Sequence, residues 1–344
     1  MLTERQLLIL QVIIDDFIQT ARPVGSRALS KKNSIPYSAA TIRNEMADLE
    51  DMGYLEKTHL SSGRIPSEQG YRYYVDHMIS PVTKFNQDMN VIKNFINDGF
   101  FEFEQLVQMS AEVLSELTNY TSIILGPELF ETKLKQLQII TLSPNSAVAI
   151  LVTNTGYVEH RSFSVPAEIN PADLEKMVNI LNDRLQGVPI VRLPEMFHSE
   201  ITDLMKAYIH DFDKSYDYLK AAFLQEQPVK LYIGGKSNLL RQPEFNDVDK
   251  IRAFYTMIEN ENEMAHLLKG TSGGIKVTIG HENKADAIKD FSLITASYQL
   301  GGDQMGTIAL LGPTRMEYRK VITLLDVLSN EMTDALYLWY KNTD

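Results

Sequence analysis

The residues whose types and spacing suggest chemistry lie in one stretch, SAATIRNEMADLEDMG, residues 38–53. Ala40 and Asn44 fall on one side at helical spacing, with Thr41 and Arg43 on the flanks. Arginine can donate two hydrogen bonds to the edge of guanine, asparagine can bond adenine in the same way, and methyl groups can contact thymine. This set predicts a helix that enters the major groove of DNA; the alternative is the solvated face of a core helix.

The opposite side of this stretch is apolar. Ile42, Met46 and Leu49 recur at steps of four and three and are expected to pack on the preceding helices. Ser38 is expected to cap the helix, since its hydroxyl can accept a backbone N–H, and Gly53 to end it.

Two further helices are predicted upstream. Ser26 is expected to cap a short basic helix that runs to about Lys32, and Pro36 then breaks the chain. A first amphipathic helix, capped by Thr3, is indicated by four apolar residues at spacings of three and four: Leu7, Leu10, Ile14 and Phe17.

After Gly53, YLEKTHL and IPSE are predicted strands on either side of the turn SSGR, and the helix SEQGYRYYVDHMI follows. Three helices and a hairpin in this order predict a winged helix-turn-helix over residues 1–80. Arg72 on the last helix could contact a phosphate or could be an ordinary surface arginine. The predicted DNA-contacting residues are Ser26, Arg27, Ser38, Ala40, Thr41, Arg43, Asn44, Lys57, His59, Ser62, Arg64 and Arg72.

The charge distribution removes an objection to DNA binding. The formal net charge is -12, but residues 1–74 hold nine Lys/Arg and nine Asp/Glu, so the whole excess lies elsewhere. Residues 17–44 contain five basic residues and no acid. Because charges are screened over about 8 Å at physiological salt, a local basic face can meet DNA while remote acidic regions are largely screened.

The run TIRNEMADLEDMGYLEKTHLSSGRIPSEQGYRYYVD resembles the HrcA family, the heat-inducible transcription repressors of bacteria. The opening TERQLLILQVIIDDFIQTARPVGSRAL and the order of the remaining chain are similar to the same family. The resemblance implies a repressor that binds the CIRCE inverted repeat upstream of chaperone operons, aided by the GroEL chaperonin.

The rest of the chain predicts an α+β domain interrupted by a helical insertion. Strand patterns occur in residues 81–165 and again in 228–344, whereas 166–227 is helical in pattern. The resemblance implies that the first two segments form a GAF-like domain and that 166–227 is a dimerisation domain. Met177, Ile180 and Leu181 could form its interface, although burial within the insertion is the default expectation.

Enzyme motifs are not found. The chain has no cysteine, GGKS at 234–237 lacks the first glycine of a phosphate-binding loop, and the seven histidines show no metal-ligand spacing. We therefore expect no catalytic residues, metal or cofactor, and a homodimeric cytoplasmic protein without a membrane span. The alternative is a metabolite-responsive regulator or enzyme whose C-terminal α+β domain binds a small molecule.

Overall fold

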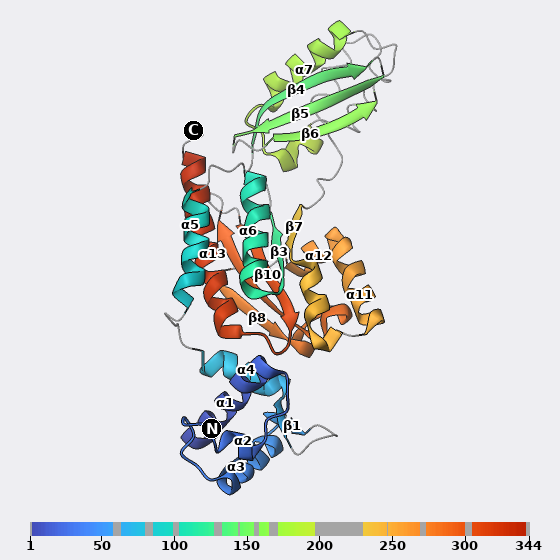
Figure 1. Ribbon diagram of the computed structural model, residues 1–344. Helices are drawn as coiled ribbons and strands as arrows, with labels where there is room; N and C mark the ends of the chain where they lie inside the picture. Colours follow the sequence, from blue (N-terminus) through green and yellow to red (C-terminus); the bar gives the residue numbers. More distant parts are fainter. Residues whose placement is uncertain are drawn as a thin grey trace. The chain divides into compact units, whose positions relative to one another are not determined.

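The computed structural model describes residues 2–57, 63–79, 85–98, 103–126, 133–143, 145–154, 158–164, 171–196, 230–245, 247–268, 273–299 and 305–341. The described residues are a mixture of helix and strand, as expected for an α+β chain. Two compact units are present (Figure 1): Met1–Leu125 with Lys230–Tyr298 and Thr307–Glu331, and Gly126–Val229 with Gln299–Gly306 and Met332–Asp344.

The N-terminal head of the first unit has the predicted order of elements: α1 (Glu4–Thr20), α2 (Ser26–Leu29), α3 (Ala39–Asp51), β1 (Leu55–Lys57), β2 (Arg64–Pro66) and α4 (Glu68–His77). The strands β1 and β2 pair antiparallel, and Val24 makes an isolated bridge to Arg64, which ties the α1–α2 turn to this hairpin. Thr3 and Ser38 cap α1 and α3 as predicted. Gly25, and not Ser26, is the N-cap of α2, which ends at Leu29 because the next residues form turns.

The body of the first unit is a five-stranded sheet in the order β7-β3-β10-β9-β8. Its strands are β3 (Thr121–Leu125), β7 (Leu231–Gly234), β8 (Ile275–Ile279), β9 (Phe291–Gln299) and β10 (Met305–Pro313). The helices around it are α5 (Asn86–Asp98), α6 (Phe103–Thr118), α11 (Val248–Glu259), α12 (Glu261–Leu268) and α13 (Tyr318–Lys341).

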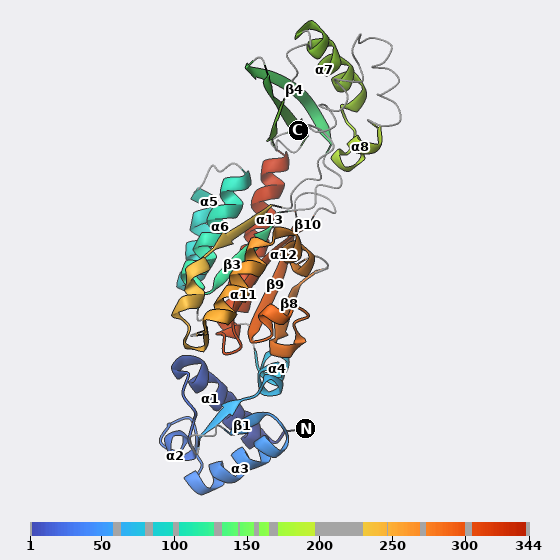
Figure 2. The same ribbon diagram turned by 90° about the vertical axis from the view of Figure 1, so that its right-hand side faces the viewer.

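Helices cover both faces of this sheet (Figure 2). Neighbouring residues of β9 show the two faces, because successive side chains of a strand point to opposite sides. The Phe291 ring stacks on Phe245 and on Phe254 of α11, with centroid distances of 4.3 and 5.3 Å. The Ser292 hydroxyl instead hydrogen-bonds Tyr318 of α13 at 2.6 Å. The stacked phenyl rings therefore join α11 to this face of the sheet.

The second unit contains a sheet of its own in the order β4-β5-β6, made of Leu134–Ser143, Ser146–Thr153 and Val158–Ser164. The helices α7 (Pro171–Leu185) and α8 (Leu193–Met196) follow it. One buried cluster joins this sheet to α7 and the segment after it: Leu134, Leu137, Ala149, Leu151, Met177, Leu181, Leu185, Ile190 and Leu193.

This cluster bears on two expectations, the domain boundary and the default expectation that Met177 and Leu181 are buried. The expected boundary at residue 166 differs from that of the compact units, which lies at 126, because strands predicted for the GAF-like domain share a buried cluster with α7. Met177 and Leu181 are fully buried inside the cluster, with Ile180 partly buried against it, so Met177 and Leu181 are core residues and not an exposed interface. Half of the expected insertion, residues 197–227, lies outside the described residues, as do residues 166–170.

The chain leaves and re-enters the five-stranded sheet at adjacent points. Strands β3 and β7 pair antiparallel, and the last residue of β3, Leu125, is the partner of Leu231, the first residue of β7. The excursion of more than a hundred residues therefore starts and ends side by side. In the described part of the chain no helix is both long and apolar enough to cross a membrane.

Candidate nucleic-acid interface

Helix α3 has two distinct faces, as its sequence predicts. Ile42, Met46 and Leu49 are buried, whereas the opposite face exposes the side chains of Ala40, Arg43, Asn44 and Ala47. The exposed face combines a guanidinium, an amide and two methyl groups with little bulk near the helix axis. Such a face can approach base edges closely and bond them.

The start of α3 is fixed by its own side chains. The Ser38 hydroxyl accepts the Thr41 N–H at 3.2 Å, and the two hydroxyls lie 2.9 Å apart. Ser38 is exposed and Thr41 is half-buried. These contacts define where the helix begins, which is the end that a recognition helix directs towards the bases.

Two ion pairs join the protein-facing sides of α3 to the rest of the head. Glu45 is buried and pairs with Arg5 of α1, with Oε1 and Nη2 2.5 Å apart. Arg64 of β2 pairs with Glu50 through both its Nε and its Nη2, each 2.6 Å from Oε2. These pairs draw two acids of α3 to its protein-facing sides and join the helix to α1 and to the hairpin.

Five basic side chains of the head form no ion pair within the described residues. Of its nine Lys/Arg, the four that form ion pairs are Arg5, Lys32, Arg64 and Arg72. The other five are exposed and make no ion pair within the described residues: Arg22, Arg27, Lys31, Arg43 and Lys57. A neutral head therefore presents free positive charge, which a polyanion can neutralise.

Two of the predicted DNA-contacting residues, Arg64 and Arg72, form ion pairs within the protein. The Arg64 side chain is only 16% exposed and its guanidinium bonds Glu50, so its contact with DNA stays a prediction. Arg72 is directed to β8 and the loop after it, where Nη2 donates to the carbonyl of Val277 in β8 at 2.8 Å and Nε to Glu282 in the loop at 2.8 Å. Its guanidinium is therefore bound within the protein, and its predicted phosphate contact stays untested.

The other predicted residues are only partly described. Ser26 is half-buried at the start of α2, while Arg27 and Lys57 are exposed. His59 and Ser62 lie outside the described residues. Arg22 and Lys31 were not among the predicted contacts, although the acid-free stretch 17–44 contains both and is the signal that points to them.

Burial and hydrogen bonding shift the pKa of the Glu282 carboxyl in opposite directions. Partial burial alone would raise the pKa of the Glu282 carboxyl, but the hydrogen bonds from Arg72 and from the Ile279 N–H outweigh it. The pKa of Glu282 therefore lies below its ordinary value of 4.5. The carboxylate form is the one that this contact stabilises.

Comparison with known proteins identifies the family of this chain. The family described as HrcA protein C terminal domain matches residues 104–322. A heat-inducible transcription repressor HrcA from Oceanobacillus iheyensis is 68% identical over 341 residues, which is 99% of each chain. A solved structure described as a hypothetical protein is 21% identical, covers 98% of this chain and 100% of its own, and superposes with a TM-score of 0.66, which shows a shared fold. The chain belongs to the HrcA family.

Proposed function

We propose that this protein is a sequence-specific transcriptional repressor that binds DNA through a winged helix-turn-helix formed by the N-terminal head. Helix α3 is the recognition helix, and the β1–β2 hairpin is the wing. The observation that carries the proposal is the exposed face of α3, where Arg43 and Asn44 stand beside two alanines with no ion pair in the described residues. The near relative named as a heat-inducible transcription repressor supports it.

The free basic residues divide into two proposed roles. Arg43 and Asn44, with Ala40 and Thr41, contact base edges and therefore specify sequence. Arg27 at the start of α2 and Lys57 on the hairpin contact phosphates, together with Arg22 and Lys31; these contacts position the head without reading sequence. His59 and Ser62 of the predicted wing remain predicted contacts.

We further propose a homodimer that reads an inverted repeat in the cytoplasm. One recognition helix reads few base pairs, whereas a two-fold dimer reads two half-sites related by the same symmetry. The resemblance to HrcA supports the CIRCE element of chaperone operons as this repeat and GroEL as the chaperonin that promotes the active form. It also supports a GAF-like fold for the five-stranded sheet body, and dimerisation through the second unit by residues other than Met177 and Leu181.

The test is binding to a duplex with the inverted repeat and to one with the repeat scrambled, each across a salt series. We expect the wild type to prefer the repeat by roughly 10³ or more at physiological salt. Arg43→Ala and Asn44→Ala are each expected to lose about 1–3 kcal/mol of that discrimination.

The matched control is Arg252→Ala, which removes the same charge from an exposed helical position of α11, where Arg252 pairs only with Asp249 in the described structure. It should bind both duplexes as the wild type does. If Arg43→Ala weakens binding to both duplexes equally, Arg43 contacts phosphate and not bases. If the folded wild type, with GroEL added, binds both duplexes alike, the repressor function is wrong.

A further inference from the structure

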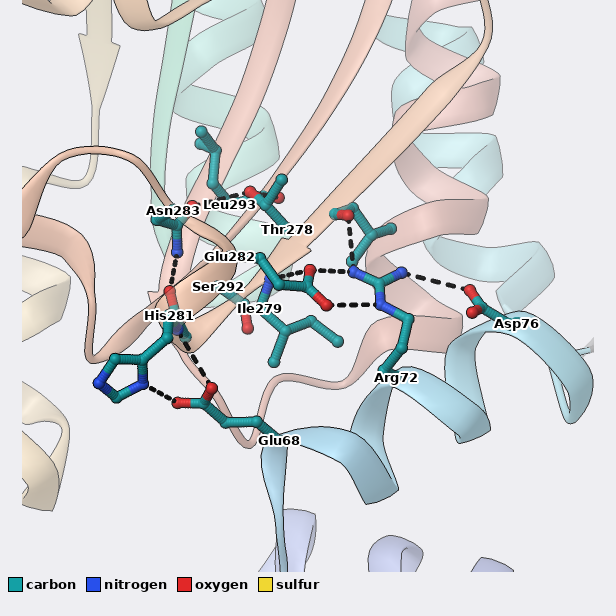
Figure 3. A network of polar contacts seen from close by, with 12 residues as sticks. Glu68, Arg72, Asp76, Thr278, Ile279, His281, Glu282, Asn283, Ser292 and Leu293 are labelled. Atoms are coloured by element: carbon teal, nitrogen blue, oxygen red, sulfur yellow. Dashed lines mark hydrogen bonds and ion pairs between the residues drawn. The ribbon is translucent and has the colours of Figure 1, made fainter. Parts of the chain in front are cut away.

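The last helix of the head, α4, is joined to the loop that follows β8 by two polar contacts (Figure 3). In the first, the Glu68 carboxylate receives the backbone N–H of His281 at 3.1 Å and lies 2.9 Å from its ring Nδ1. Both bonds come from one residue of the loop to one carboxylate of the helix. Glu68 is thereby held in a single place on the body.

In the second contact the helix supplies the positive group and the loop supplies the carboxylate. Arg72 donates through Nε and Nη2 to the two carboxylate oxygens of Glu282, through Nη2 to the Val277 carbonyl, and through Nη1 to Asp76 at 3.2 Å. A guanidinium that bonds both oxygens of a carboxylate is oriented as well as attracted. Glu68 and Arg72 are one helical turn apart, and their partners are consecutive residues, so the two contacts together fix both position and rotation of α4.

The loop that receives α4 is itself rigidly held. Gly280 has a φ of +55°, in the left-handed region, and a Cβ at this position would collide with the Glu68 carboxylate. Asn283 donates its side-chain amide to the carbonyls of Gly280, Ile288 and Phe291 at 2.9, 3.0 and 2.8 Å. A loop fastened at so many points can act as a fixed receptor.

Further contacts, one between two aromatic rings and two to backbone carbonyls, also join the head to the body. The Tyr71 ring is buried and lies 5.7 Å from the ring of Tyr318, the first residue of α13. Arg319 donates to the carbonyl of Met78 at the end of α4, and Arg315 to that of Ile18 near the end of α1, both at 3.3 Å. The head is therefore docked on the body along the whole of α4.

We propose that Glu68 and Arg72 are positioning residues that hold the DNA-binding head in one orientation on the sheet body, so that the dimer discriminates between half-site spacings. This rests on the proposed DNA-binding function. A head on a loose tether would accept several spacings, whereas a docked head transmits the geometry of the dimer to α3. Arg72 then contributes to recognition without touching DNA.

The first experiment measures DNA binding by Arg72→Gln, Glu282→Gln and the double variant. The duplexes carry the native half-site spacing or one base pair more or less. We expect the preference for native spacing to fall by roughly fivefold in each single variant, the ratio that a well-formed exposed ion pair can sustain. The double variant should lose less than the sum of the two single variants, because both substitutions remove the same Arg72–Glu282 ion pair.

The dependence of binding affinity on salt concentration distinguishes a positioning role of Arg72 from a direct phosphate contact. Loss of one phosphate contact would lower the slope of log K against log salt by about 0.9, so an unchanged slope in Arg72→Gln is expected. Arg252→Gln is the control for loss of an arginine. A changed slope with unchanged spacing preference would overturn the positioning role.

The second experiment needs no DNA. Because the chain contains no cysteine, spin labels can be attached at Glu4→Cys in the head and Val248→Cys on α11, both exposed positions. Labelled protein is diluted with unlabelled chains, and the distribution of label distances is measured. We expect a narrow distribution in the otherwise wild-type chain and a broad one with Arg72→Gln or Glu282→Gln.

Equal widths with and without these substitutions would overturn the inference. Broadening without a change in spacing preference would also overturn it, since orientation would then not govern recognition. If the wild type shows no preference for the inverted repeat, the repressor function fails, and the distance distributions still decide by themselves whether these residues orient the head.

Discussion

Gly70, in the first turn of α4, is expected to be intolerant of the smallest possible side chain. A Cβ built at Gly70 would lie closer than 3.0 Å to the Tyr54 carbonyl oxygen, and that oxygen also accepts the Ser67 N–H at 3.1 Å. In a free helix, Gly→Ala would stabilise by at most about 1 kcal/mol. Here the obstacle is backbone and not a flexible side chain, so an overpacking cost of about 1–3 kcal/mol opposes this gain.

The expected net effect of Gly70→Ala is a loss of about 1–2 kcal/mol in the free energy of unfolding, since the backbone cost lies in the upper part of its range. Urea unfolding followed by far-UV circular dichroism measures it. The control is Gln69→Ala, the neighbouring exposed position of the same helix, which should stay within about 0.5 kcal/mol of wild type. A Gly70→Ala protein as stable as wild type, or more stable, would show that the Tyr54 carbonyl moves freely and that close packing does not require glycine here.

Three further outcomes are expected. Ser38→Ala should lower stability by about 1 kcal/mol through loss of the cap to Thr41, with Ser38→Asp retaining most of it in thermal unfolding. Leu181→Ala should cost about 2–5 kcal/mol and speed amide hydrogen exchange in β4–β6; a change in dimer dissociation alone would contradict its assignment to the core. The pKa of Glu282 is depressed in the folded state, so its ion pair with Arg72 should contribute fully to the free energy of unfolding above about pH 4.5. This contribution should be lost as the pH falls through the lower folded pKa. Acid unfolding of Glu282→Gln should lack this part of the pH dependence.

Local features were predictable from sequence because they repeat at short range. The burial of Ile42, Met46 and Leu49 and the exposure of Arg43 and Asn44 follow from the 3.6-residue period, and the structure confirms these two faces. The capping role of Ser38 is likewise confirmed, since the capping hydroxyl and the backbone N–H that it accepts are only three residues apart. Whether this face reads DNA stays a prediction.

Contacts between distant residues were not predictable. Arg72 meets Glu282, 210 residues away, and one sequence contains no signal that would pair these two. The strands of residues 134–164 were recognisable as strands, but alternation does not say which sheet a strand joins. Their packing on Leu181 and its neighbours, and hence the boundary at 126, depends on such tertiary partners.

The pairing of Leu125 with Leu231 gives the Gly126–Val229 segment of the second unit the connectivity of an enlarged hairpin loop. Paired residues of antiparallel strands have Cα atoms about 4.5–5.5 Å apart, a gap that a tight turn also spans. The entropic cost of closing a loop rises only slowly with its length, so the body accommodates a large insert at little more cost than a short one. Residues between β3 and β7 can therefore be exchanged, lengthened or reduced to a turn in the course of descent while the remaining sheet keeps its order.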